Sequence, residues 1–198
     1  MMDRNAESAA AKTPPLHLSK PVVMVGLMGA GKSRIGRELA AKLKYDFIDA
    51  DDEIIRAAGC SISDIFEMYG EDAFRDVEMK VITRLLDGPP RIIATGGGAF
   101  MNESVRQKIA ANGISIWLKA DIDILVERTG RRQGRPLLDN GDPKAVLEDL
   151  MKQRYPVYDS ADIAITSRDV PINETVEEVE AALENFLISG KPQRDTAR

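Results

Sequence analysis

Apolar residues along the chain alternate between short unbroken runs and longer runs with helical spacing. The short runs are rich in β-branched residues, which is typical of buried strands. The longer runs place apolar residues on one helical face, as Ile35, Leu39 and Leu43 do. The predicted strands cover 21–26, 45–50, 91–98, 113–120 and 161–167. The predicted helices cover 32–43, 61–70, 71–88, 102–111, 121–130, 143–155 and 175–189.

This alternation of strands and helices predicts a single α/β domain with a parallel sheet over residues 21–189. Sheets of this kind bind ligands at the carboxyl ends of their strands. Residues 1–20, rich in Ala, Ser, Lys and Pro, are predicted to be a disordered leader, and 190–198 a tail. Residues 131–142 carry three arginines, two glycines and a proline without a period, which predicts a mobile loop.

The composition excludes several classes of protein. No apolar run approaches the roughly 18 residues of a membrane span, and the leader lacks the apolar segment of a secretory signal. Cys60 is the only cysteine and His17 the only histidine, which disfavours disulfides, zinc sites and Ser-His-Asp chemistry. The net charge of −5 disfavours general nucleic-acid binding. We therefore expect a cytoplasmic protein, and we expect it to be a monomer.

Residues 26–33 match the phosphate-loop pattern G-x-x-x-x-G-K-[ST] in full, with a predicted strand before it and a helix after it. Glycines in such a loop let backbone N–H groups surround phosphate oxygens. Lys32 can reach the β- and γ-phosphates, and the hydroxyl of Ser33 can hold Mg²⁺. The segment predicts binding of ATP or GTP with Mg²⁺. The residues assigned to the nucleotide here are Gly29, Ala30, Gly31, Lys32, Ser33 and Arg34.

Two aspartates follow the second predicted strand. Asp49 and Asp51 are two residues apart, so in an extended chain they share a face. We assign Asp49 to the Mg²⁺ shell and Asp51 to the acceptor hydroxyl, as a candidate general base. The alternative is that both are N-cap or first-turn residues of the helix that starts with DDEIIRAAG. The Asn-Lys-x-Asp base-reading motif is absent, which disfavours a regulatory GTPase.

The chain resembles the shikimate kinase family from about Val22 to Leu187. The loop GLMGAGKSRIGRELA is similar to that family's phosphate loop beyond the minimal pattern. Further family motifs then follow in the family's order. They are the Asp-x-Asp at 49–51, Phe74-Arg75 with Glu78, Gly96-Gly97-Gly98, Arg-Pro-Leu-Leu at 135–138, and Arg154.

The resemblance implies a three-layer, nucleoside-monophosphate-kinase-like fold around a central five-stranded parallel sheet. It also implies transfer of the γ-phosphoryl group of ATP to the 3-hydroxyl of shikimate, with Mg²⁺ as cofactor. The products would be shikimate 3-phosphate and ADP, on the route to chorismate and the aromatic amino acids.

The resemblance also implies residue roles. The catalytic residues would be Lys32, Asp51 and Arg135, with Arg135 on the 131–142 loop, which would act as a lid and contact the nucleotide as well. Ser33 and Asp49 would hold the metal. The remaining roles fall to three groups. Arg128 would stack on adenine; Arg75, Arg154, Gly96, Gly97 and Gly98 would bind the acid together with Asp51; and Ile62, Phe66 and Phe74 would form its apolar wall.

Other interpretations of these residues stay open at this point. Arg75 and Glu78 also have the spacing of an ordinary helix ion pair, and Gly96–Gly98 could be a flexible turn. Arg131 and Arg132 are typical of solvated charges. The rival functions are another small-metabolite kinase, such as a gluconate or nucleotide kinase, and a nucleotide-dependent module without catalysis. Trp117, in the middle of a strand, is predicted to be part of the core.

Overall fold

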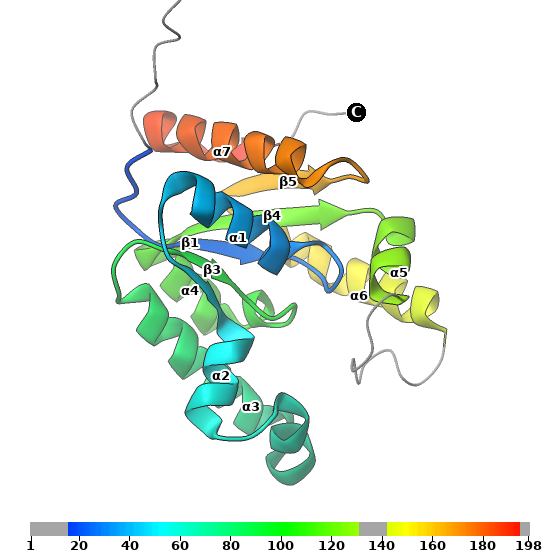
Figure 1. Ribbon diagram of the computed structural model, residues 1–198. Helices are drawn as coiled ribbons and strands as arrows, with labels where there is room; N and C mark the ends of the chain where they lie inside the picture. Colours follow the sequence, from blue (N-terminus) through cyan, green and yellow to red (C-terminus); the bar gives the residue numbers. More distant parts are fainter. Residues whose placement is uncertain (1–15, 131–141, 195–198) are drawn as a thin grey trace, which may run out of the picture.

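The computed structural model describes residues 16–130 and 142–194. Its centre is one sheet in which every strand pairs in parallel with its neighbour, in the order β2-β3-β1-β4-β5-β6 (Figure 1). Parallel strands need crossover connections, and helices supply them here. The strands are β1 (Val22–Val25), β2 (Phe47–Asp49), β3 (Ile92–Ala94), β4 (Ile114–Ala120), β5 (Ile163–Ser167) and β6 (Gln193–Arg194).

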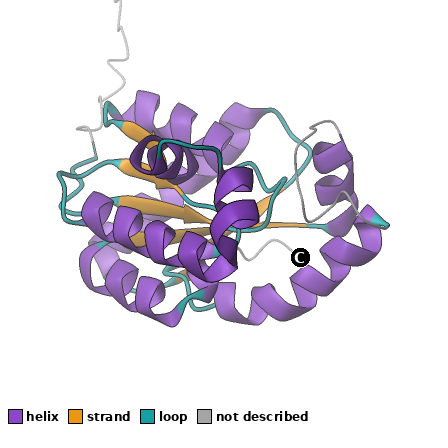
Figure 2. Cartoon of the chain, turned by 90° about the horizontal axis from the view of Figure 1, so that it is seen from below, coloured by secondary structure: helices purple, strands orange, loops and turns teal. Residues whose placement is uncertain are grey.

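Helices cover both faces of this sheet (Figure 2). Helix α1 packs against α7 on one face, and α3 packs against α4 on the other. None of the helices in the described ranges is long and apolar enough to span a membrane. The helices are α1 (Lys32–Leu43), α2 (Ala50–Ala58), α3 (Ile62–Leu86), the 3₁₀ turn η1 (Ala99–Met101), α4 (Glu103–Asn112), α5 (Ile122–Gly130), α6 (Pro143–Tyr158) and α7 (Ile172–Ser189).

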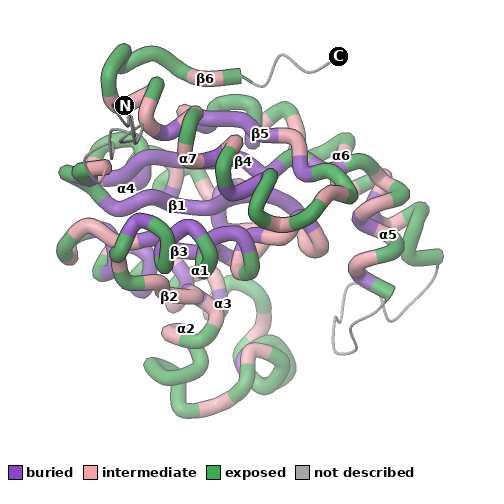
Figure 3. Tube along the Cα trace, turned by 45° about the horizontal axis from the view of Figure 1, so that its top comes forward, coloured by how far each residue is buried: buried purple, intermediate pink, exposed green. Residues whose placement is uncertain are grey.

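The core lies where the sequence pattern predicts it. All four residues of β1 are buried, because a central parallel strand is covered on both faces (Figure 3). Trp117 on β4 is only 4% exposed, which confirms its predicted place in the core. The predicted division of the long helical segment is also confirmed. At Gly70, α3 leaves helical geometry with φ 81° and ψ 177°, a conformation that suits glycine.

The predicted number of strands was wrong, because the sheet formed by residues 16–130 and 142–194 has six strands and not five. The sixth, β6, lies in the predicted tail and pairs with β5 through Gln193 opposite Ile163 and Arg194 opposite Ala164. Arg194 also donates hydrogen bonds to the carbonyls of Asp159 and Asp162. A two-residue polar strand has no hydrophobic periodicity, so the apolar pattern gave no signal for it.

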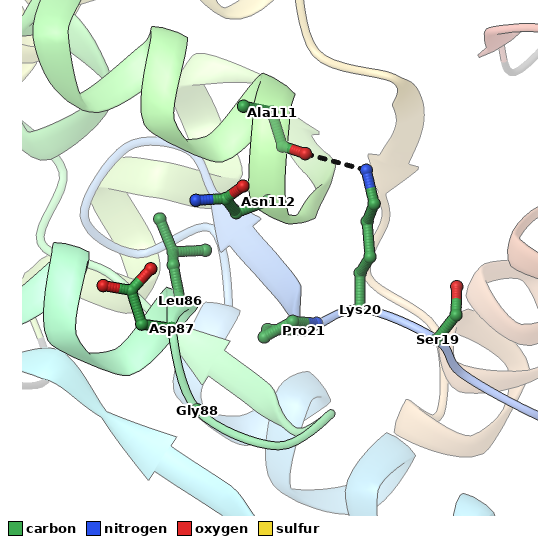
Figure 4. Close-up of a pocket in the computed structure, with 8 residues that line it drawn as sticks. All are labelled: Ser19, Lys20, Pro21, Leu86, Asp87, Gly88, Ala111 and Asn112. Carbon is green, nitrogen blue, oxygen red and sulfur yellow. Dashed lines mark hydrogen bonds between the residues drawn. The ribbon is translucent and has the colours of Figure 1, made fainter.

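The predicted boundary between the leader and the domain, at residue 20, was also placed too far along the chain. Residues 16–20 lie against the domain, where Leu18 is 1% exposed and its N–H donates to the hydroxyl of Tyr45 at 2.9 Å. Lys20 donates to the carbonyl of Ala111 at the end of α4 (Figure 4). Two leucines, Leu16 and Leu18, among prolines and polar residues are too few to show burial in a sequence pattern.

We predict that Leu18→Ala lowers the free energy of unfolding by about 2–4 kcal/mol, because it removes a buried side chain and leaves a cavity. Urea denaturation followed by circular dichroism measures the change. Ile188→Ala is the matched control, since Ile188 is 79% exposed and its loss should change stability by less than about 0.5 kcal/mol. Equal stabilities of the Leu18→Ala variant and the unmodified protein would contradict this assignment.

Candidate active site

The phosphate loop connects β1 to α1, as the motif predicts. Gly29 and Gly31 have φ values of 84° and 98°, which non-glycine residues rarely adopt. The ammonium of Lys32 donates to the carbonyls of Gly26 and Leu27, both at 2.9 Å, so the side chain folds back over the loop. Ala30 is buried and can offer only its backbone to a ligand, whereas Arg34 in the first turn of α1 is exposed.

Asp49 combines the two roles that the sequence left open. One carboxylate oxygen, Oδ1, accepts from the N–H of Asp51 and caps α2, at 3.1 Å. The other, Oδ2, accepts from the hydroxyl of Ser33 at 2.7 Å. The capping interpretation is therefore correct for one oxygen, and the second lies beside the phosphate loop.

The oxygens of Ser33 and Asp49 suit Mg²⁺, which prefers hard oxygen ligands. No cluster of three His, Cys, Asp or Glu side chains occurs within residues 16–130 and 142–194 that could hold a metal alone. Mg²⁺ commonly binds through one or two protein groups together with substrate phosphates and water. The donor set at Ser33 and Asp49 fits this kind of site.

Asp51 and Glu78 approach the glycine turn after β3 from two different helices. A Cβ atom placed on Gly96 would lie 3.1 Å from Asp51 Oδ1 and 3.1 Å from Glu78 Oε1. Burial raises the pKa of Asp51, and the negative charge of Asp49 adds to that increase, while Lys32 opposes it. Burial also raises the pKa of Glu78, against the opposing effect of Arg75. The carboxyl groups of Asp51 and Glu78 are therefore both partly desolvated beside Gly96.

Glu78 is a site residue whose burial the sequence interpretation missed. It forms the expected helix pair with Arg75, at 2.7 Å, but it is only 1% exposed. Its Oε1 atom has no hydrogen-bond partner in the part of the chain that the structure describes. A signal was present in the sequence, because Glu78 shares a helical face with the buried residues Phe74, Val81, Ile82 and Leu85.

The two arginines predicted to bind an acid meet at the same glycine turn. Arg75 on α3 is so close to Gly98 that a Cβ atom there would lie 2.6 Å from Nη2. The Arg75 guanidinium also lies over the ring of Phe74, 5.0 Å from its centroid. Arg154 on α6 donates to the carbonyl of Gly97 at 2.9 Å. Side chains from α3 and α6 therefore both contact this turn. They lie in the space that Cβ atoms would fill if the turn had residues other than glycine.

The predicted apolar wall is partly assembled. The rings of Phe66 and Phe74 are 4.7 Å apart, with Phe74 buried and Phe66 38% exposed. Ile62, at the start of α3, is partly buried against the core.

Arg128 lies beside the phosphate loop. Its Nη1 atom would be 3.9 Å from a Cβ atom on Gly31, and it donates to the hydroxyl of Ser167 at 2.9 Å. Nη2 donates to the carbonyl of Arg168 at 2.8 Å. Arg135, Arg131 and Arg132 lie outside the described residues, as does nearly all of the predicted lid.

An open groove lies at the other end of the sheet, where β1 begins and α3 and α4 end (Figure 4). Pro21, Gly88 and Asn112 are among its lining residues. It contains none of the predicted site residues. The phosphate loop follows the other end of β1, at the carboxyl ends of the strands. The groove is therefore separate from the candidate active site.

A phosphate loop between β1 and α1 of an all-parallel sheet, with carboxylates and arginines beside it, defines the class of phosphate-loop kinases. The shikimate kinase family model matches residues 28–184. The shikimate kinase of Bradyrhizobium diazoefficiens is 51% identical over 182 residues, covering 90% of this chain and 88% of the relative. That of Paramagnetospirillum magneticum is 49% identical, covering 94% and 97%. The chain belongs to the shikimate kinase family, which confirms the resemblance noted from its motifs.

Solved structures agree with this assignment. Shikimate kinase from Acinetobacter baumannii in complex with shikimate superimposes with a TM-score of 0.80 and 34% identity, covering 87% of this chain and 94% of that one. The enzyme from Aquifex aeolicus gives 0.72 and 30%, covering 86% and 99%. A gluconokinase from Sinorhizobium meliloti reaches 0.55 at 20% identity, covering 86% and 97%, which shows a shared fold alone.

We predict that Asp51→Asn stabilises the folded protein at pH 7. Because the pKa of Asp51 is raised on folding, its ionised form lowers stability at any pH above that value, and asparagine removes this cost. The gain should shrink as pH falls through the raised pKa and disappear below the ordinary value of 3.8. Denaturant unfolding at a series of pH values measures it. Asp52→Asn is the control, because Asp52 is the next residue and is exposed. An equal gain in stability from Asp52→Asn would show that the change in net charge is the cause.

Proposed function

We propose that this chain transfers the γ-phosphoryl group of ATP to the 3-hydroxyl of shikimate, giving shikimate 3-phosphate and ADP with the help of Mg²⁺. One observation carries the proposal, namely that Arg154, which is assigned to the acid, and the phosphate loop both lie beside Gly97. A Cβ atom on Gly97 would lie 3.4 Å from the carbonyl oxygen of Gly26, 3.4 Å from the N–H nitrogen of Met28 and 3.5 Å from Arg154 Nη1. An acid held by Arg154 is therefore next to the loop that holds phosphates.

The acceptor side suits a small hydroxylated acid. Planar guanidinium groups bind carboxylates through paired hydrogen bonds, and Arg75 and Arg154 bring two of them to one turn. Asp51 faces the same turn and can accept a hydrogen bond from a ring hydroxyl. Its raised pKa also brings it closer to the range in which a carboxylate acts as a general base. The rings of Phe66 and Phe74 supply an apolar surface for a carbon ring.

The nucleotide side needs positioning and positive charge more than covalent chemistry. Lys32 would release its carbonyl partners and turn to the β- and γ-phosphates. Arg128, which lies beside the loop, would stack on the adenine. Mg²⁺, held through Ser33 and Asp49, would neutralise charge on the phosphates.

A coupled assay of ADP release tests the proposed function. We expect ADP release with shikimate and not with gluconate, AMP or CMP, and we expect Lys32→Ala to abolish it because a phosphate contact is lost. Release with gluconate alone would favour the alternative metabolite kinase. Nucleotide binding without ADP release for any acceptor would favour a binding module.

We further predict that Gly98→Ala weakens shikimate binding about tenfold, because the added methyl group displaces the guanidinium of Arg75 from the turn. Calorimetry with shikimate measures the affinity. Gly98 has φ −98°, so alanine fits the backbone and the fold should survive.

Two comparisons sharpen this test. Arg75→Ala should cost about 2–5 kcal/mol of shikimate binding with little effect on ATP. Gly130→Ala is the matched glycine control, because a Cβ atom there would meet nothing within 4 Å. Unchanged shikimate affinity in Gly98→Ala would contradict the role of Arg75, and equal loss of both ligands in Arg75→Ala would do the same.

A further inference from the structure

The carbonyl oxygen of Gly97 accepts two side-chain hydrogen bonds from α6. Arg154 donates one from Nη1 at 2.9 Å, and the hydroxyl of Tyr158 donates the other. The two donors are four residues apart, so they lie one above the other on the same face of the helix. Tyr158 thus shares a hydrogen-bond acceptor with Arg154, the arginine that is proposed to bind the acid.

Tyr158 is held rigidly for this contact. It has no exposed surface, and its ring packs 6.2 Å from that of Phe100 and 6.0 Å from that of Trp117, measured between centroids. A buried phenol needs a hydrogen-bond partner, and the carbonyl of Gly97 is that partner. Burial also raises the pKa of Tyr158, which keeps the hydroxyl a donor. A phenylalanine would fill the same space, so packing alone does not require the hydroxyl.

The Gly97 peptide lies between the two halves of the site. On one side a Cβ atom on Gly97 would lie 3.4 Å from backbone atoms of Gly26 and Met28 in the phosphate loop. On the other side the Gly97 carbonyl accepts from Arg154 and Tyr158. A bond that fixes this peptide therefore fixes the spacing between the phosphates and the acid-binding arginine. Small errors in such spacing reduce the rate of transfer strongly.

We propose that Tyr158 is a positioning residue, whose hydroxyl holds the Gly97 peptide and through it aligns Arg154 with the phosphate loop. Where shikimate is named as the acid, this inference rests on the proposed function. The contact itself does not, because it joins two groups of this chain.

Tyr155 offers a matched control on the same helix. Its hydroxyl donates to the carbonyl of Ala120 at 2.5 Å, at the end of β4. Among the described residues it makes no hydrogen bond to the glycine turn. Burial raises its pKa to about 12, so it too is a neutral donor. Tyr155→Phe and Tyr158→Phe each remove one buried hydroxyl from α6. They differ in which backbone carbonyl loses its donor.

In steady-state kinetics we expect Tyr158→Phe to raise the KM for shikimate about five- to tenfold and to leave the KM for ATP within about twofold, the scale of one hydrogen bond. Tyr155→Phe should change neither value. In the Arg154→Lys background, Tyr158→Phe should add little further loss, because both side chains act through Gly97. Fully additive effects, or equal effects of the two tyrosine substitutions, would overturn the proposal.

Hydrogen exchange of residues 95–101 in the ligand-free protein gives a readout that needs no substrate. Tyr158→Phe should speed exchange in this segment and Tyr155→Phe should not. If the unmodified protein failed to phosphorylate shikimate, the proposed function would fall, and this exchange alone would decide the role of Tyr158. Unchanged exchange in Tyr158→Phe would overturn it.

Discussion

The close approach of charged side chains to a turn without side chains is the constraint on which the site depends. Gly96, Gly97 and Gly98 follow β3, and each has a functional group where its Cβ would project. Two carboxyl groups occupy the space beside Gly96, the phosphate loop and Arg154 that beside Gly97, and Arg75 that beside Gly98. Any larger residues here would separate the nucleotide side from the acceptor side.

The charges at this turn balance each other locally. Asp51 and Glu78 have raised pKa values because burial disfavours their ionised forms. The guanidinium of Arg75 lies between Glu78 and Glu71, at 2.7 and 3.0 Å, so these two carboxylates orient it. An acidic chain can therefore present positive charge to an anionic ligand at one place, because the arginines are concentrated there and held by the fold. Burial of the two ionised carboxylates lowers the stability of the folded protein.

Much of the fold and part of the site could be predicted from local patterns. The phosphate loop, the capping of α2 by Asp49 and the break at Gly70 depend on residues close together in the chain, so short motifs reveal them. The strand β6 and the packing of Leu18 depend on distant partners. No short window of sequence contains both members of such a contact.

By itself, the sequence determined the order of strands β1 to β5, the phosphate loop and the family, because backbone conformation and motif spacing are local properties. Only the tertiary structure decided that Arg154 and Tyr158 share the carbonyl of Gly97, from 57 and 61 residues away. It also decided that Asp51 and Glu78 face one glycine. The physical reason is that hydrogen bonding and desolvation depend on which surfaces meet, and packing of the helices on the sheet sets that.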